Sequence, residues 1–316
     1  MTSEKLQQQY SLLTDQSGFV VLPKRCHLLL TGDDRSKFLN NFCTSNISEL
    51  SAGQGAELFI LDTRGKTIAF GHVFNLQQGL LISTAAGDQS NSLMQHLDKY
   101  VIREDVSITD QSDSTASVFV IGKLSAEKLG VSDLDQNQTS SIEFGRLIAH
   151  VELAGFGFLI NCDVNETDKL VQHLESLGIG HCELDALQSV RHEYGTPWTG
   201  FEIDESNLPQ ELRRDEKAIS FTKGCYLGQE TVAKIDAFGH VNKFMVAVQI
   251  TEGGAPEQET EIQIDGSKIG TIKTVAFSSK LKSSLALGFV KCKFADPGTE
   301  VSIGKSKGKI ASLPIH

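Results

Sequence analysis

The amino-acid sequence changes its pattern at Lys243, and this change constrains the fold more than any other feature. Before Lys243, apolar stretches with strand character alternate with stretches that have helical spacing. After it come only short apolar stretches separated by turn residues, in the order KFMVAVQI, TEIQID, KIGTIKTVAF, SLALGFVK, TEVSI and KGKIASLPI. Short strands at regular spacing are typical of a small barrel or sandwich. The pattern therefore predicts an all-β domain over residues 241–316.

The region before Lys243 repeats one order of elements. Strands over residues 57–61, 67–76 and 80–84 precede a helix over 89–100. Further along, strands over 141–153 and 155–162 precede a helix over 168–178, and both helices carry the triplet Gln-His-Leu. The repetition indicates two α+β units with antiparallel sheets covered by helices. We assign residues 1–50 with 140–240 to one discontinuous α+β domain and residues 51–139 to a second.

Charge and hydropathy exclude several classes of protein. The net charge of −11 argues against general nucleic-acid binding, because a polyphosphate needs a positive face. The basic residues between Arg213 and Lys234 form either a local patch or scattered solvated side chains. No apolar run reaches the ~20 residues of a membrane span, and the first residues lack the features of a signal peptide. We expect a cytoplasmic protein, not bound to membranes, and a monomer because no coiled-coil seam is present.

The six cysteines predict neither a disulfide framework nor a metal site. No two of them form a CxxC pair. Cys26-His27 and His181-Cys182 are adjacent pairs, but neighbouring residues on a strand point to opposite faces. No second ligand pair follows either of them at zinc-site spacing. We therefore expect no metal ligands in this chain.

One cysteine stands apart in the stretch KGCYLGQE, residues 223–230. Gly224 and Gly228 bracket Cys225 and favour a tight turn, after which a short helix begins near residue 229. A lysine two residues earlier, Lys223, and a nearby helix N-terminus would both favour the thiolate. The alternative is a buried structural cysteine.

A second candidate lies in the helix predicted for ELDALQSVRHEYG. Apolar residues recur there at helical spacing, and Gly195 ends the helix. Arg191 and Glu193 fall on its last turn. An acid at that position opposes the helix dipole, which indicates a functional role for Glu193 such as accepting hydrogen bonds from a ring rich in N–H groups. The alternative is a surface ion pair between the two residues.

These motifs together resemble one family. The stretch at residues 223–230 resembles the signature of the YgfZ-type folate-binding family, within the superfamily of the glycine-cleavage T-protein, an aminomethyltransferase. Other blocks follow in the family's order, namely GDDRSKFLNNFCTSNISELSAGQG, LDTRGKTIAF, RHEYGTPWTG, IGTIKT and ALGFVK. The resemblance spans nearly the whole chain.

The resemblance implies an α+β protein of three domains arranged as a cloverleaf around a central hole. The domain over residues 51–139 would be ferredoxin-like, and the last domain a small β-barrel. A tetrahydrofolate or a one-carbon derivative would lie in the hole, with its pterin ring on the carboxylate of Glu193. The other residues expected at the folate are Arg191, Asn46, Gly224, Gln229 and Glu230. Cys225, with Lys223, would be the catalytic group.

The sequence departs from the family pattern at one position. Aminomethyltransferases carry an Asp pair in the strand after the Gly-rich turn, where this chain has Ile68, Ala69 and Phe70. We therefore expect a tetrahydrofolate-binding accessory protein that supports assembly or repair of iron–sulfur clusters, for example in tRNA-modifying radical-SAM enzymes. The alternatives are a folate-dependent aminomethyltransferase or demethylase-like one-carbon transferase, and a regulatory protein without folate binding.

Overall fold

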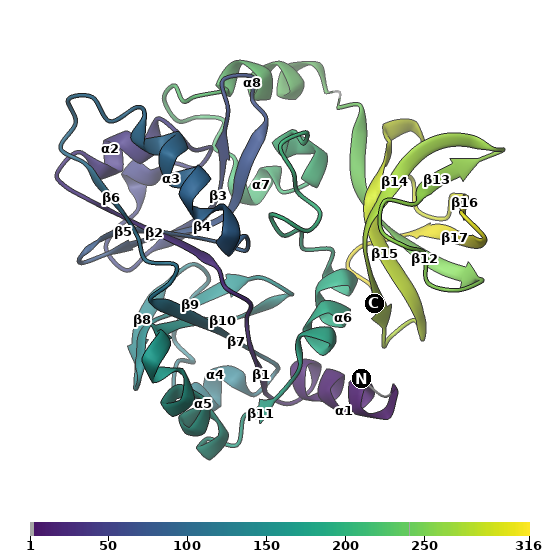
Figure 1. The fold of residues 1–316 in the computed structure, drawn as a ribbon, viewed down its shortest axis with the longest axis horizontal. Coiled ribbons are helices and arrows are strands. Elements are labelled where there is room, and N and C mark those ends of the chain that lie inside the picture. Colours follow the sequence, from purple (N-terminus) through teal and green to yellow (C-terminus); the bar gives the residue numbers. More distant parts are fainter. Residues whose placement is uncertain (1–2, 240) are drawn as a thin grey trace.

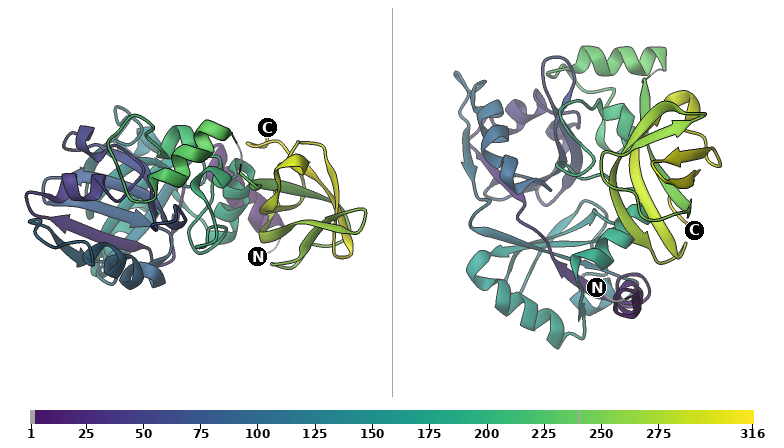
Figure 2. Two further views of the ribbon diagram at one scale, coloured as in Figure 1. Left: turned by 90° about the horizontal axis from the view of Figure 1, so that it is seen from above. Right: turned by 45° about the vertical axis from the view of Figure 1, so that its right-hand side comes forward.

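The computed structural model describes residues 3–239 and 241–316. They form two α+β units and a β-barrel, grouped around a centre that all three border (Figure 1). Figure 2 shows the same grouping from two other directions, with the barrel to one side of the two units. The helices are α1 (Ser3–Thr14), α2 (Arg35–Asn40), α3 (Ser90–Asp98), α4 (Ser125–Leu129), α5 (Thr167–Ser176), α6 (Leu184–Tyr194), α7 (Asp215–Ala218) and α8 (Gln229–Phe238).

The first unit is built on a five-stranded sheet with the order β3-β4-β5-β2-β6. Every pairing in it is antiparallel. Its strands are β2 (Cys26–Thr31), β3 (Gly55–Leu61), β4 (Thr67–Leu76), β5 (Gly79–Thr84) and β6 (Ser107–Asp110). Helices α2 and α3 pack on one face of this sheet through a shared apolar cluster.

The second unit has a six-stranded sheet with the order β11-β1-β7-β10-β9-β8. Its strands are β1 (Gly18–Val21), β7 (Thr115–Ile121), β8 (Thr139–Ile142), β9 (Gly145–Glu152), β10 (Phe156–Asp163) and β11 (Gly180–His181). The pairing of β1 with β11 is parallel and the others are antiparallel. Helices α4 and α5 cover its outer face.

The last strands close into a barrel with the order β12-β15-β14-β13-β16-β17. They are β12 (Lys243–Glu252), β13 (Glu261–Ile264), β14 (Ser267–Ser278), β15 (Ser283–Lys291), β16 (Glu300–Ile303) and β17 (Ser306–Ala311). The predicted fold class is therefore confirmed: two α+β units with antiparallel sheets, and a C-terminal barrel beginning at Lys243.

The sheets divide the chain differently from the expected boundaries at residues 50 and 139. Strand β2 lies before residue 50 but pairs with β5 and β6 of the first unit. Strand β7 lies before residue 139 but pairs with β1 and β10 of the second. The cause is the short link after Val21, because β1 and β2 on either side of it enter different sheets. The proline in that link signals a break between strands but not a change of sheet.

The two sheets share a core that fixes their relative position. Phe74 and Leu81 of the first sheet belong to the same buried cluster as Phe119 and Leu159 of the second, and Val190 of α6 joins them. Helix α6 also contacts β14 of the barrel, so it links the second unit to the barrel. Among the described helices, none has the length and apolar character needed to cross a membrane.

Candidate functional site

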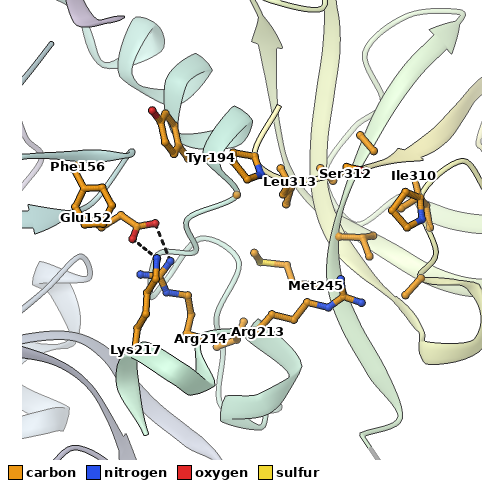
Figure 3. Close-up of a pocket in the computed structure, with 18 residues that line it drawn as sticks. Glu152, Phe156, Tyr194, Arg213, Arg214, Lys217, Met245, Ile310, Ser312 and Leu313 are labelled. Carbon is orange, nitrogen blue, oxygen red and sulfur yellow. Dashed lines mark hydrogen bonds and ion pairs between the residues drawn. The ribbon is translucent and has the colours of Figure 1, made fainter. Parts of the chain in front are cut away.

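A pocket of about 560 Å³ opens where the second unit, α6 and the barrel meet (Figure 3). Glu152 ends β9 and Phe156 begins β10, so the hairpin turn between them carries both side chains to the pocket. Tyr194 is the last residue of α6, which stops at Gly195 in a left-handed conformation with φ 70°. Strand β12 and residues 310–314 form the barrel side of the wall. A volume of this size is typical of small-molecule sites.

Arg214 is the centre of the pocket's charge network. Its Nη1 donates to Oε1 of Glu152 at 2.9 Å, and its Nε donates to Oε2 of Glu57 at 3.1 Å. Nη2 donates to the other oxygen of Glu57. Lys217 donates to Oε2 of Glu152 at 2.6 Å, as the dashed lines of Figure 3 show in part. Two carboxylates on separate sheets are thus joined through one guanidinium.

The network shifts the acidities of its members. Burial alone would raise the pKa of Glu152, but the hydrogen bonds and charges of Arg214 and Lys217 outweigh burial and lower it. Burial raises the pKa of Glu57, although the guanidinium of Arg214 opposes the shift. Glu152 is therefore held ionised and already accepts bonds from two cations. A carboxylate in this state is a poor acid for donating a proton to a substrate.

Two aromatic rings give the pocket apolar surface. Phe156 is 45% exposed and Tyr194 is 42% exposed, although both are large side chains. Figure 3 shows them on the same side of the pocket, one from β10 and one from α6. Exposed rings in a concave site are suited to stacking against a flat ligand ring. The sequence signal for Phe156 is weak: an aromatic residue directly after the glycine of a hairpin.

Glu193 lies on α6 as predicted but is not among the residues that line this pocket. Its side chain is buried, and its Oε2 accepts a hydrogen bond of 2.5 Å from the hydroxyl of Tyr10. Its Oε1 accepts from Ser278 Oγ at 2.6 Å and from the backbone N–H of Lys280 at 3.1 Å. The carboxylate thus joins α1 and the barrel to α6. Its role toward a ligand stays a prediction.

Arg191 does not pair with Glu193. It is fully buried, and its Nη1 and Nη2 donate to the two oxygens of Glu202, each at 2.7 Å. Nη1 also donates to the carbonyl of Thr196. The guanidinium lies 4.9 Å from the ring centre of Trp198. Arg191 thus holds the segment after α6 in place, and the surface ion pair considered from the sequence is wrong.

Cys225 is exposed, in contrast to four buried cysteines and the partly buried Cys292. Helix α8 begins four residues after it, with Gly228 as the N-cap. The amine of Lys223 is buried, and it donates to the carbonyls of Asn40, Cys43 and Ser45 at 2.6, 3.0 and 2.6 Å. Lys223 therefore anchors the loop after α2. The prediction that it acts with the thiol stays untested.

The other predicted ligands lie away from the pocket wall. Asn46 is half-buried and precedes a short 3₁₀ helix, Ile47–Glu49. Gly224 is exposed, and the first two residues of α8, Gln229 and Glu230, are half-buried and exposed. None of the four lines the described pocket between α6 and the barrel. Their assignment to a folate site stays a prediction.

Strand β4 carries no carboxylate along its whole length. Ala69 and Phe70 are buried, and Phe70 packs in a cluster with residues of α8 and the barrel. The carboxylate nearest in register is Glu57 of β3, opposite His72. Among the described residues, no three His, Cys, Asp or Glu side chains gather in a way that could hold a metal ion.

Comparisons with known proteins agree with this architecture. Residues 13–216 match the family model of the GCVT N-terminal domain, and residues 243–314 match that of the glycine cleavage T-protein C-terminal barrel domain. The chain is 25% identical to a putative transferase of Arabidopsis thaliana named At1g60990, chloroplastic, over 90% of this chain and 68% of the relative. It is 24% identical to an aminomethyltransferase of Thermoanaerobacter pseudethanolicus, over 95% of this chain and 85% of the relative.

A solved structure shares the fold. It is the glycine cleavage system aminomethyltransferase T from Bartonella henselae, with a TM-score of 0.82 and 15% identity, covering 98% of this chain and 89% of that one. The family models together account for both α+β units and the barrel. The chain therefore belongs to the glycine cleavage T-protein family.

Proposed function

We propose that the chain binds a tetrahydrofolate in the pocket between α6, the second unit and the barrel. The observation that carries this proposal is the pairing of exposed aromatic rings with a charged wall in a pocket of about 560 Å³. Phe156 and Tyr194 offer faces for the pterin ring. Arg213 and Lys217 are exposed cations of the same wall, and they suit the carboxylates of the folate's glutamate tail.

Two carboxylates are candidates for holding the pterin's N–H groups. Glu193 is the residue that the family resemblance implies, and it would have to exchange its bond with Tyr10 to bind the ring. Glu152 lies in the pocket wall, where it already accepts bonds from Arg214 and Lys217. Glu193, Asn46 and the residues of the 223–230 stretch lie outside the wall of this pocket, so their assignment to a folate site is the alternative placement of the same ligand. Anaerobic titrations of Glu193→Gln and Glu152→Gln rank the two, because the true anchor loses at least tenfold in affinity.

The first candidate for the activity is folate-dependent one-carbon transfer. It is supported by the relatives named aminomethyltransferase, which match nearly the whole chain. A bound tetrahydrofolate would supply the nitrogen atoms that accept or donate the one-carbon unit. Release of ammonia from a thiol-bound aminomethyl group, measured with and without tetrahydrofolate, tests this activity. The carbon of such a donor is already at the oxidation level of formaldehyde, so its bonds to nitrogen and sulfur are exchanged for bonds to two folate nitrogens without an oxidant. Folate-dependent release supports it, and release at the rate of a folate blank contradicts it.

The second candidate is a non-catalytic accessory role in iron–sulfur cluster assembly or repair. It is supported by β4, which has no carboxylate, and by the paired state of Glu152 and Glu57. Cys225 would be the functional thiol, with iron–sulfur proteins as clients. Cluster content of a radical-SAM client expressed with wild-type or Cys225→Ala protein tests this role, and equal cluster content contradicts it. The cytoplasmic location and monomeric state remain predictions alongside it.

A further inference from the structure

A second, small pocket borders Glu152, which also lines the large pocket. Its volume is about 10 Å³, which is room for one water-sized or halide-sized occupant. Its wall includes Arg25, just before β2, His72 of β4, and Thr196, just after α6. Three separate segments therefore contribute a polar side chain to one space.

Three side-chain atoms in the wall of this space lack hydrogen-bond partners among the described residues. Neither ring nitrogen of His72 has a hydrogen-bond partner within residues 3–239 and 241–316, and neither does Oγ1 of Thr196. The two side chains are 2% and 1% exposed. The carboxylate oxygen of Glu57 is 3.9 Å from Nε2 of His72, too far for a hydrogen bond. Buried polar atoms are nearly always bonded, so these atoms point to an occupant.

The charge of Arg25 is also uncompensated. Arg25 is 3% exposed, and among the described residues its guanidinium donates one long hydrogen bond, of 3.4 Å from Nε to Ser83 Oγ. No ion pair joins it to a carboxylate in the part of the chain that the structure describes. Glu57 instead forms an ion pair with Arg214, and Glu152 forms ion pairs with Arg214 and Lys217. Arg25 is therefore a buried guanidinium without a carboxylate partner among the described residues, whereas Arg214 bonds to both buried carboxylates.

Burial lowers the pKa of His72 to about 3, so its ring is neutral at physiological pH and offers one N–H donor. The donors around the space are then a guanidinium, a hydroxyl and an imidazole N–H. A donor set with an excess positive charge suits an anion better than water or a cation. Glu152 is the one carboxylate in the wall, and its charge is balanced by two cations.

We infer that Arg25, His72 and Thr196 form a buried site for a small monovalent anion of halide size. The anion would balance Arg25 and would join β2 and β4 of the first unit to the segment after α6. This inference does not depend on folate binding. It predicts that the folded chain is stabilised by chloride, because a ligand that binds only the folded state raises its stability by mass action.

The test compares thermal unfolding of the full chain in sodium chloride and in sodium gluconate at equal ionic strength, since gluconate is too large for the space. We expect the midpoint to be about 2–4 °C higher in chloride. Arg25→Met should lose this difference. Arg64→Met, which removes an exposed guanidinium, should keep it. Equal midpoints of the wild type in the two salts would overturn the inference.

A bromide soak of wild-type crystals gives an independent readout. An anomalous peak in contact with Arg25 and Thr196 supports the site, and density for a water molecule alone contradicts it. If Arg25→Met does not fold, this soak and Thr196→Val decide the question. Thr196→Val keeps the charge but removes one donor, so it should reduce the chloride-dependent shift.

Discussion

Replacing Arg214 by methionine tests the charge network at the pocket most sharply. Arg214 is 7% exposed and donates to both oxygens of Glu57 and to one of Glu152. Methionine keeps much of the side-chain volume but removes every donor. Glu152 retains Lys217, whereas Glu57, 3% exposed, loses its cation. Breaking a buried ion pair from one side costs about 3–5 kcal/mol, so we expect a loss of unfolding free energy of that order.

The loss should depend on pH, and its sign follows from the proton balance. Without Arg214, burial and the charge of Glu152 raise the pKa of Glu57 and only the charge of Lys217 opposes them, so its folded-state pKa rises further above the unfolded value of about 4.3. The folded variant then binds more protons than the unfolded chain above that pH. Its stability relative to the wild type therefore falls as pH rises and recovers toward acid.

Urea unfolding at pH 5, 6, 7 and 8 measures this directly. We expect the wild-type and variant midpoints to lie closest at pH 5 and furthest apart at pH 8. The double variant Arg214→Met with Glu57→Gln should recover part of the loss, because the uncompensated charge is gone. Arg64→Met, at an exposed site, should change little. A loss that does not vary with pH, or that stays below about 1 kcal/mol, would refute the reasoning.

Three other outcomes follow from the structure. Iodoacetamide at pH 7 should label Cys225 before the other cysteines, because its side chain is the exposed one. Peptide mapping that finds another cysteine labelled first would exclude Cys225 as the functional thiol. Glu193→Ala should reduce the unfolding free energy by about 3 kcal/mol, because three hydrogen bonds to a buried carboxylate are lost. It should also reduce tetrahydrofolate affinity by at least tenfold if Glu193, rather than Glu152, anchors the pterin; unchanged values in titration and urea unfolding would remove Glu193 from both roles. Burial would raise the pKa of Glu202, but the charge and hydrogen bonds of Arg191 outweigh burial and lower this pKa. The free energy of unfolding should therefore fall as pH drops through the lowered pKa. In urea unfolding between pH 6 and 3, Glu202→Gln should reduce this loss of stability in acid, and an unchanged loss would contradict the assignment.

Most of the fold can be predicted from the sequence, because helices, strands and turns are encoded by local residue patterns. Periodicity located α6 and the helix after residue 167, and the change at Lys243 marked the start of the barrel. Which sheet each strand joins is not a local property. The link between Val21 and Cys26 looks like any break between strands, yet it separates two sheets.

The candidate site was harder to predict from the sequence, because its contacts join segments that are far apart in the chain. The dipole argument singled out Glu193, but its partners Tyr10 and Ser278 lie far along the chain in both directions. The cluster of basic residues after Leu212 was visible in the sequence. Arg214 pairs with Glu57 and Glu152 because the two sheets pack together, and this pairing cannot be predicted from the local sequence.

The central claim, that a tetrahydrofolate binds against the aromatic rings of the pocket, is tested most directly by anaerobic calorimetric titration of the wild type and Phe156→Ala. Stacking of a nucleobase on an aromatic side chain contributes about 1–3 kcal/mol in proteins that bind single-stranded nucleic acid, and a pterin is a flat ring of similar kind. We expect binding to the wild type and an affinity about 5- to 150-fold weaker for Phe156→Ala, whereas Phe144→Ala, an exposed ring outside the pocket, should bind as the wild type does. No binding to the wild type, or equal affinity for all three proteins, would contradict the account.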